Sequence, residues 1–221
     1  MAPIAAHWKS LGFTFDAIYS GYLASPEEVS LVREFFRDFD TGSTLRFVDP
    51  AMADYGKLYS GFGEDFPRQM GLLCGEADII VPNLTEAALL TGLPYRTEYD
   101  EDYVRQILQA LASLGTRKAV VVTGMSPEPG QTGFCGMDVQ TGEIFRFSQE
   151  KLQRSYHGTG DLFASVTVGS LVRGFSLQRA LETAAGFVAA AIRETMTNDP
   201  EKTYGVDFEA VLPELIAFLR P

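Results

Sequence analysis

The feature that most constrains the fold is an alternation of short apolar runs with longer amphipathic segments. This pattern predicts strands at 16–20, 45–48, 78–81 and 118–123, followed by a hairpin of 133–138 and 143–148 around the turn 139–142. Parallel neighbours need long crossover connections, so strand–helix alternation predicts a mostly parallel sheet with helices on both faces. We therefore expect an α/β fold, a doubly wound three-layer α/β/α sandwich, formed by one domain spanning residues 1–221.

Capping signals predict where the helices begin and end. Ser25 followed by Pro26 is typical of an N-cap and first helical position, and Gly115 and Gly174 are typical of C-terminal ends. The expected helices span 26–39, 65–74, 85–91, 99–114, 160–173, 177–197 and 207–219. The segment 126–132 is rich in Pro and Gly, which predicts a loop that could act as a flap near a ligand.

Charge and composition exclude several classes of protein. The net charge of −11 over 221 residues argues against a nucleic-acid-binding surface. No apolar run approaches the roughly 20 residues that cross a bilayer, and residues 1–10 lack a signal-peptide pattern. We therefore expect a cytoplasmic protein that binds neither nucleic acid nor a membrane. Cys74 and Cys135 have no metal-ligand spacing, so free thiols are expected.

A glycine-rich segment, Gly158-Thr159-Gly160-Asp161, leads into one of the predicted helices. The first amides of a helix have no internal partners and carry the positive end of its dipole, and glycines let a phosphate approach them. A carboxylate beside that phosphate could deprotonate an attacking alcohol. The alternative is purely structural, because an Asp in the first turn also complements the dipole. Neighbouring His157 is expected to pack or cap in the loop.

The ends of the predicted strands carry small, polar or aromatic residues. They are Ser20-Gly21-Tyr22, Asp49-Pro50, Pro82-Asn83 and Thr123-Gly124. In open parallel sheets, ligands bind beyond the carboxyl ends of the strands. Together with the glycine-rich segment, these residues predict a ligand site along one edge of the sheet.

Four segments, in this order, resemble the pyridoxal/pyridoxamine kinases of the ribokinase-like superfamily. They are Ser20-Gly21-Tyr22-Leu23, Asp49-Pro50-Ala51-Met52-Ala53-Asp54-Tyr55-Gly56, Val81-Pro82-Asn83-Leu84-Thr85-Glu86 and Gly158-Thr159-Gly160-Asp161. The resemblance runs from about Ile4 to the C-terminus. It implies ATP-dependent phosphorylation of the 5′-hydroxymethyl group of pyridoxal, pyridoxamine or pyridoxine in vitamin B6 salvage, with Mg²⁺ and a monovalent cation as a further candidate. It also implies a homodimer.

The same resemblance implies roles for single residues. Asp161 would be the catalytic base, and the amides around Gly158, Thr159 and Gly160 would form the anion hole for the transferring phosphoryl group. Such amides would compensate the negative charge that a phosphoryl-transfer transition state spreads over the phosphoryl oxygens.

Other residues would hold the nucleotide, the cation and the ring. Asn83, Thr123 and Gly124 are expected to bind the nucleotide, and Tyr22 would stack on the pyridine ring. Glu86, Asp54 and Asp49 would act at the metal, with Glu86 acting through water, because Mg²⁺ keeps several waters. Each of these residues also has a purely structural alternative. Asn83 could be a helix N-cap, Glu86 an acid in the first helical turn, and Asp49 the start of a turn. Thr123 and Gly124 could mark the end of a strand, and Tyr22 could be a buried residue at a strand end.

The chain also departs from the family. The segment that precedes Ile4 in relatives, with its first strand and lid strands, is expected to be absent, which would expose an edge at strand 16–20. Ala53 stands where relatives often have glycine. Val81 stands where some have threonine, which removes a possible hydroxyl ligand for a monovalent cation.

Two alternatives to a vitamin B6 kinase are open. One is another ribokinase-like kinase, acting on hydroxymethylpyrimidine or a sugar, although Tyr22 and Asp54 argue against a sugar. The other is a nucleotide-binding protein without turnover, which the expected absence of the N-terminal segment motivates.

Overall fold

The computed structural model describes residues 2–126 and 128–220. The chain divides into two compact units, residues 1–148 and residues 149–221. Each unit has its own elements and its own apolar core, and they are described in turn.

The first unit is built on a sheet that has six strands among the described residues, in the order β1-β2-β5-β6-β7-β8. Strands β1, β2, β5 and β6 are parallel, and β7 is antiparallel to β6. The chain is therefore an α/β protein with a mostly parallel sheet, as predicted. The strands are β1 (Ala17–Ser20), β2 (Leu45–Val48), β5 (Ile79–Ile80), β6 (Ala119–Thr123), β7 (Gln131–Asp138) and β8 (Ile144–Glu150), of which β8 continues into the second unit.

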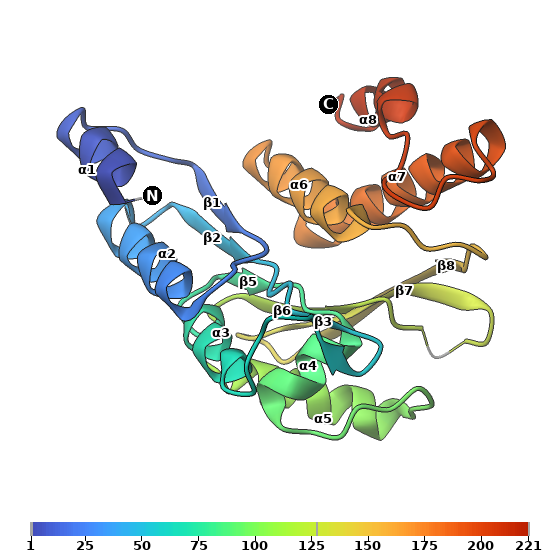
Figure 1. The fold of residues 1–221 in the computed structure, drawn as a ribbon, viewed down its shortest axis with the longest axis horizontal. Helices are drawn as coiled ribbons and strands as arrows, with labels where there is room; N and C mark the ends of the chain where they lie inside the picture. The colour runs from blue at the N-terminus through green and yellow to red at the C-terminus, as the bar shows by residue number, and fades with distance from the viewer. Residues whose placement is uncertain (1, 127, 221) are drawn as a thin grey trace. The chain divides into compact units, whose positions relative to one another are not determined.

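Helices connect the parallel strands. They are α2 (Pro26–Asp38), α3 (Phe66–Cys74), α4 (Leu84–Thr91) and α5 (Glu101–Ala112), and a further helix, α1 (Ala2–Ser10), precedes β1. The chain moves from β1 to β2, β5 and β6 in one direction across the sheet. Right-handed crossovers in a constant direction place their helices on one face, and α2 to α5 follow one another along that face in Figure 1.

The core of this unit lies between those helices and the sheet. Central strand residues such as Val48, Ile80 and Val120 are fully buried in this core, as are Phe36 on α2 and Ile107 on α5. The strands read as nearly continuous apolar runs because a parallel sheet in such a fold is shielded from water.

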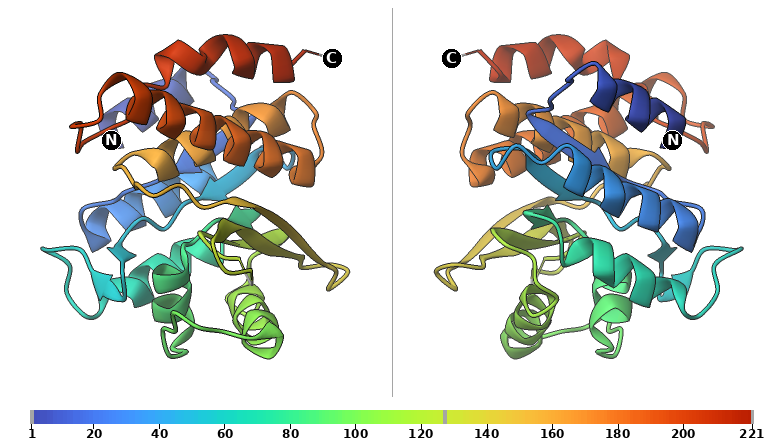
Figure 2. Two further views of the ribbon diagram at one scale, coloured as in Figure 1. Left: turned by 90° about the vertical axis from the view of Figure 1, so that its right-hand side faces the viewer. Right: turned by 90° about the vertical axis from the view of Figure 1, so that its left-hand side faces the viewer.

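The second unit is helical. It contains α6 (Thr159–Val172), α7 (Leu177–Asn198), a 3₁₀ turn (Glu209–Val211) and α8 (Leu212–Phe218). Figure 2 shows these helices, in orange and red, packed on one another. Their small core includes Val166, Ala184 and Phe187. The helices predicted last in the sequence, with α6 and α7 as the long pair, therefore form a unit of their own.

Several predicted boundaries shift for local reasons. Helix α5 begins at Glu101 rather than at 99, because the side chain of Asp100 accepts a hydrogen bond from the Tyr103 amide and caps the helix. The helix predicted at 207–219 is a 3₁₀ turn followed by α8, with a proline in the first turn of α8. Proline lacks the amide that an uninterrupted helix needs.

Two elements were not predicted from the sequence. One is α1 at the N-terminal end. The other is a small antiparallel hairpin of β3 (Ala53–Asp54) and β4 (Lys57–Leu58). The hairpin turn contains Tyr55 and Gly56, both with positive φ. This short hairpin is central to the candidate site.

Strand β1 is the terminal strand of the sheet in the described part of the chain, as expected for an edge strand at 16–20. Its residues are buried or half-buried, so the exposure predicted for this edge stays a prediction. A mostly apolar cavity of about 380 Å³ lies beside it, lined by residues of α1, β1 and α2. The Ser20 hydroxyl on this strand is buried and has no partner among the described residues.

Two further expectations concern the whole chain. None of the helices that the structure describes is long and apolar enough to cross a membrane. Cys74 and Cys135 are both free thiols and both buried, as predicted. Burial raises the pKa of each thiol, and the nearby Glu86 and Asp49 carboxylates raise that of Cys74 further. Both thiols are therefore protonated and unreactive at neutral pH.

Candidate active site

The carboxyl ends of the four parallel strands are tied together by backbone hydrogen bonds. The Asp49 amide donates to Ser20 O at 2.8 Å, and the Val81 amide donates to Val48 O at 3.0 Å. The Thr123 amide donates to Pro82 O at 2.9 Å, next to an isolated parallel bridge between Asn83 and Thr123. These contacts bring the predicted strand-end residues of the first unit to one edge of its sheet.

The N-terminus of α4 is closed by its own side chains. Asn83 is the N-cap, and its Oδ1 accepts a hydrogen bond from the Glu86 amide at 3.0 Å. Glu86 Oε2 in turn accepts from the Asn83 amide at 2.9 Å, which completes a capping box. The structural interpretation of both residues is therefore confirmed, whereas their roles at a nucleotide or a metal stay predictions.

Glu86 does more than cap its helix. Its Oε1 accepts hydrogen bonds from the amides of Met52 at 3.0 Å and Ala53 at 3.4 Å, more than thirty residues earlier in the chain. The side chain is buried, with the residue 2% exposed. Burial and the negative charge of Asp49 raise the pKa of Glu86 to about 8, although its three backbone amides oppose this shift. Asp49 is itself only 8% exposed. Two acids thus share a poorly solvated position at the sheet edge.

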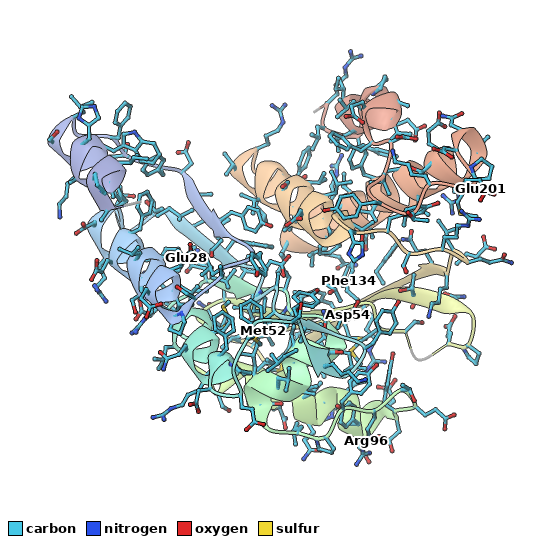
Figure 3. All side chains as sticks on the ribbon, in the orientation of Figure 1. Glu28, Met52, Asp54, Arg96, Phe134 and Glu201 are labelled. Atoms are coloured by element: carbon cyan, nitrogen blue, oxygen red, sulfur yellow. The ribbon has the colours of Figure 1, made fainter. Side chains whose placement is uncertain are left out.

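The β3–β4 hairpin is fastened to the start of α4. Asn83 Nδ2 donates to Ala53 O at 2.8 Å, and the Gly56 amide donates to Thr85 Oγ1 at 3.0 Å. Met52 before the hairpin is buried, whereas Asp54 is exposed and accepts a hydrogen bond from the Tyr55 amide at 2.8 Å (Figure 3).

The three acids predicted at a metal are not gathered into one group. Within residues 2–126 and 128–220, no cluster of three or more His, Cys, Asp or Glu side chains is placed to hold a metal ion. Asp49 and Glu86 interact electrostatically, but Asp54 projects from the exposed hairpin.

The donor set nevertheless suits Mg²⁺. Its oxygens are hard ligands, and Mg²⁺ keeps several waters instead of demanding a complete protein cage. Both oxygens of Glu86 already accept backbone hydrogen bonds, which favours contact through water. A cation near Asp49 and Glu86 would also relieve the repulsion that raises the pKa of Glu86. These two acids are therefore the residues that would hold it.

Thr123 and Gly124 form the turn that leaves β6. Thr123 is partly buried and donates to Pro82 O through its hydroxyl as well as its amide, at 3.4 and 2.9 Å. Gly124 is exposed and has φ +71°, a left-handed conformation that favours glycine. The turn therefore presents exposed backbone at the same edge as Asn83.

Tyr22 is not the buried strand-end residue of the structural alternative. It follows β1 and is 56% exposed. Its ring lies 5.5 Å from that of Phe62, which stacks on Phe66 at 4.1 Å. The Tyr22 ring therefore has an open face and an aromatic neighbour, an arrangement that can receive a flat ring.

The N-terminus of α6, in the second unit, contrasts with that of α4. Gly158 is its N-cap with φ +85°, and no side chain caps the helix. The Thr159 hydroxyl turns back to Tyr156 O at 3.0 Å instead of capping. Asp161 is exposed in the first turn. The segment therefore has the glycine-containing, open helix start that the sequence predicted for an anion cradle, while the catalytic role of Asp161 stays a prediction.

His157 packs in this loop, as expected. Its ring lies 5.4 Å from that of Tyr204. The contact is local to the second unit and indicates a structural role.

Sequence reasoning missed three contributors to the site. The amides of Met52 and Ala53 carry no sequence signal, since any residue supplies an amide. Phe62, which packs on Tyr22, lies in a segment without regular periodicity. The positive φ of Tyr55 and Gly56 left a faint signal, because a glycine in a short polar stretch is typical of a tight turn.

Comparison with known proteins identifies the family. The sequence model of the phosphomethylpyrimidine kinase family matches residues 4–205. The chain therefore belongs to the phosphomethylpyrimidine kinase family, whose solved relatives share its ribokinase-like fold.

Three solved structures illustrate this likeness. A putative phosphomethylpyrimidine kinase from Bacteroides thetaiotaomicron is 35% identical with a TM-score of 0.92, covering 97% of this chain and 74% of that one, and a second crystal form contains pyridoxal. The pyridoxal kinase from Lactobacillus plantarum is 32% identical with a TM-score of 0.87, covering 97% and 76%. The pyridoxal kinase from Staphylococcus aureus, solved with ADP, is 26% identical with a TM-score of 0.73, covering 87% and 67%.

The curated relatives include both pyridoxal kinases and hydroxymethylpyrimidine/phosphomethylpyrimidine kinases. A putative pyridoxal kinase from Caenorhabditis elegans is 29% identical over 68% of this chain, and a hydroxymethylpyrimidine/phosphomethylpyrimidine kinase from Haemophilus influenzae is 28% identical over 78%. The chain spans 47% and 63% of the length of these two proteins.

Proposed function

We propose that this protein transfers the γ-phosphoryl group of ATP to the 5′-hydroxymethyl group of a B6 vitamer, namely pyridoxal, pyridoxamine or pyridoxine. The observation that carries the proposal is the start of α6. There a left-handed glycine leaves the helix without a side-chain cap, and one carboxylate, Asp161, stands in the first turn. An open helix start attracts phosphate, and a carboxylate beside it can take the proton of an attacking alcohol.

In this mechanism the hydroxymethyl oxygen attacks the γ-phosphorus and loses its proton to Asp161. The bond between the γ-phosphorus and the β–γ bridging oxygen breaks, and the products are ADP and the phosphorylated vitamer. The amides around Gly158, Thr159 and Gly160 donate to the phosphoryl oxygens, whose charge the transition state spreads.

The first unit supplies the binding groups. Thr123, Gly124 and Asn83 line the nucleotide, and Tyr22 stacks on the vitamer ring. Mg²⁺, when bound, compensates the phosphate charge, and Asp49 and Glu86 would hold it, with Glu86 acting through water. Asp54, on the exposed hairpin, would add negative charge near the metal. The monovalent cation and the homodimer implied by the family remain part of this hypothesis.

The aromatic pair at the first unit favours a ring substrate. Tyr22 has an open face and is supported by Phe62. The same feature also fits hydroxymethylpyrimidine, the second candidate, which the relatives of that name support. A nucleotide-binding protein without turnover is the third candidate, which the experiment below distinguishes from a kinase.

The test is ADP release by the purified 221-residue chain with pyridoxal, pyridoxamine, pyridoxine and hydroxymethylpyrimidine, alongside calorimetric ATP binding. Turnover fastest with a B6 vitamer supports the proposal. Turnover confined to hydroxymethylpyrimidine replaces the substrate but keeps the mechanism. ATP binding without turnover on any of the four would contradict the kinase activity and favour the third outcome.

A further inference from the structure

A single tyrosine holds both backbone groups of Ser126, just beyond the turn that leaves β6. Tyr99 Oη donates to Ser126 O at 3.1 Å and accepts from the Ser126 amide at 2.9 Å. A phenol has one proton and free lone pairs, so it can serve a carbonyl and an amide together. Tyr99 lies immediately before the N-cap of α5 and is 27 residues away from Ser126 in sequence.

The side chain of Ser126 is held as well. Its hydroxyl lies 3.0 Å from the Ser148 hydroxyl on β8, and it accepts from the Glu128 amide at 3.2 Å. At the other end of the turn, the Thr123 amide donates to Pro82 O. Residues 123–126, here called the nucleotide loop, are therefore clamped at both ends. The exposed backbone at Gly124 lies between the clamps, and Met125 beside it is fully buried.

The Tyr99 hydroxyl is suited to this task. Its ring packs against the core, and burial raises the pKa of the phenol. The hydroxyl thus keeps its proton at neutral pH and can donate to the Ser126 carbonyl. The bonds join the segment just before α5 to the loop that follows β6, 27 residues away in sequence.

Tyr103, in the first turn of α5, provides an internal comparison four residues further along the chain. It is buried, and its hydroxyl donates to Pro94 O at 2.8 Å. Its ring is also covered by the Arg96 guanidinium, 5.0 Å from the ring centroid, and Arg96 is labelled in Figure 3. Tyr103 therefore fixes the connection between α4 and α5, whereas Tyr99 fixes the nucleotide loop.

We propose that Tyr99 is a positioning residue that sets the affinity for ATP by fixing the backbone of the nucleotide loop through Ser126. This inference rests on the proposed function, which places Thr123 and Gly124 along the nucleotide. Tyr99 touches neither substrate nor reacting atoms in this scheme, so its removal changes nucleotide affinity and leaves the chemical step intact.

The test compares Tyr99→Phe with Tyr103→Phe, because each removes one phenol that bonds to the backbone. For Tyr99→Phe we expect the KM and the calorimetric Kd for ATP to rise about three- to tenfold, because the variant loses both hydrogen bonds between the hydroxyl and the Ser126 backbone. Its kcat at saturating ATP and its KM for the vitamer stay at the wild-type value. Tyr103→Phe should lower the melting temperature, because it removes the hydrogen bond to Pro94 O, but it should leave the KM for ATP unchanged.

Ser148→Ala provides a second test of the loop's effect on the KM for ATP, with both tyrosines left in place. It removes only the hydroxyl that bonds to Ser126, so a smaller rise in the KM for ATP is expected, with normal folding. An ATP affinity unchanged in both Tyr99→Phe and Ser148→Ala would overturn this inference alone, provided that the wild-type chain uses ATP. A wild-type chain that neither binds nor turns over ATP would overturn the proposed function and this inference with it.

Discussion

Two helix starts in this protein solve the same problem in opposite ways. The first amides of α4 are satisfied by Asn83 and Glu86, and the Glu86 carboxylate also bonds to amides of the preceding hairpin segment. The start of α6 has Gly158 in the left-handed region and no side-chain cap. The first is closed by its own side chains, whereas no side chain caps the second, where we propose that a phosphate binds. The comparison shows that a capping box satisfies the first amides of a helix with the chain's own side chains, whereas a left-handed glycine leaves them without a side-chain partner.

The largest effect should come from the acid at the open start. Asp161→Asn removes the proposed base and keeps its shape, so turnover should fall by about 10²- to 10⁴-fold. ATP affinity measured by calorimetry should change little. Glu182→Gln is the matched control, because Glu182 lies on α7, away from the glycine-rich segment, and accepts a hydrogen bond from Gln178 in the same helix. Full turnover in the Asp161 variant would remove this residue from the mechanism.

The closed start should dominate the pH dependence of stability. The pKa of Glu86 is about 8 in the folded chain and near its ordinary value when unfolded, so the folded state binds this proton more tightly. Its contribution to stability is complete below about pH 4.5, falls as pH rises toward 8, and is flat above that.

The measurement is urea unfolding between pH 5 and pH 9 for the wild type and Glu86→Gln. The wild type should lose about 4 kcal/mol over this range through this group, and the variant should lose less. The slope is the readout, because the amide also replaces one acceptor oxygen and lowers stability at every pH. Equal slopes in the two proteins would mean that Glu86 is ionised throughout.

Asn83→Ala should weaken the closed start by a smaller amount. It deletes the N-cap of α4 and the bond from Asn83 Nδ2 to Ala53 O, at a cost of about 1–2 kcal/mol. Chemical unfolding measures this loss. Ser176→Ala, which deletes the side-chain cap of α7 alone, is the control and should cost about 1 kcal/mol. A cost no larger than that of the control would mean that the hairpin bond adds nothing.

Gly158→Ala tests the open start with the smallest expected change in stability. The residue has φ +85°, and a methyl group added there would meet no atom within 4 Å, so the cost comes from backbone strain, about 1 kcal/mol. If the loop cradles phosphate, turnover should fall by more than this loss of stability explains. Gly174→Ala, at φ +87° after α6, is the matched control and should leave turnover unchanged. Equal effects on activity would remove the glycine from the anion hole.

Much of the architecture could be read from local patterns. The strands appear where apolar runs predict them, and Ser25 caps α2 as expected, with its side chain accepting from the Glu28 amide. The left-handed Gly158 and the capping role of Asn83 also follow from residue type and spacing. Such features depend on hydrogen bonds and dihedral preferences within a few residues, so the sequence alone determines them.

Tertiary structure decided how the first unit's site is assembled. Glu86 is buried because the amides of Met52 and Ala53, far away in sequence, close over it, while Asp54 one residue further on stays in solvent. The bonds of Tyr99 to Ser126 and the packing of Tyr22 on Phe62 likewise join distant segments. Backbone amides and ring faces look alike wherever they occur in a sequence. Only folding determines which of them meet, and burial then determines the pKa and exposure of the side chains that they surround.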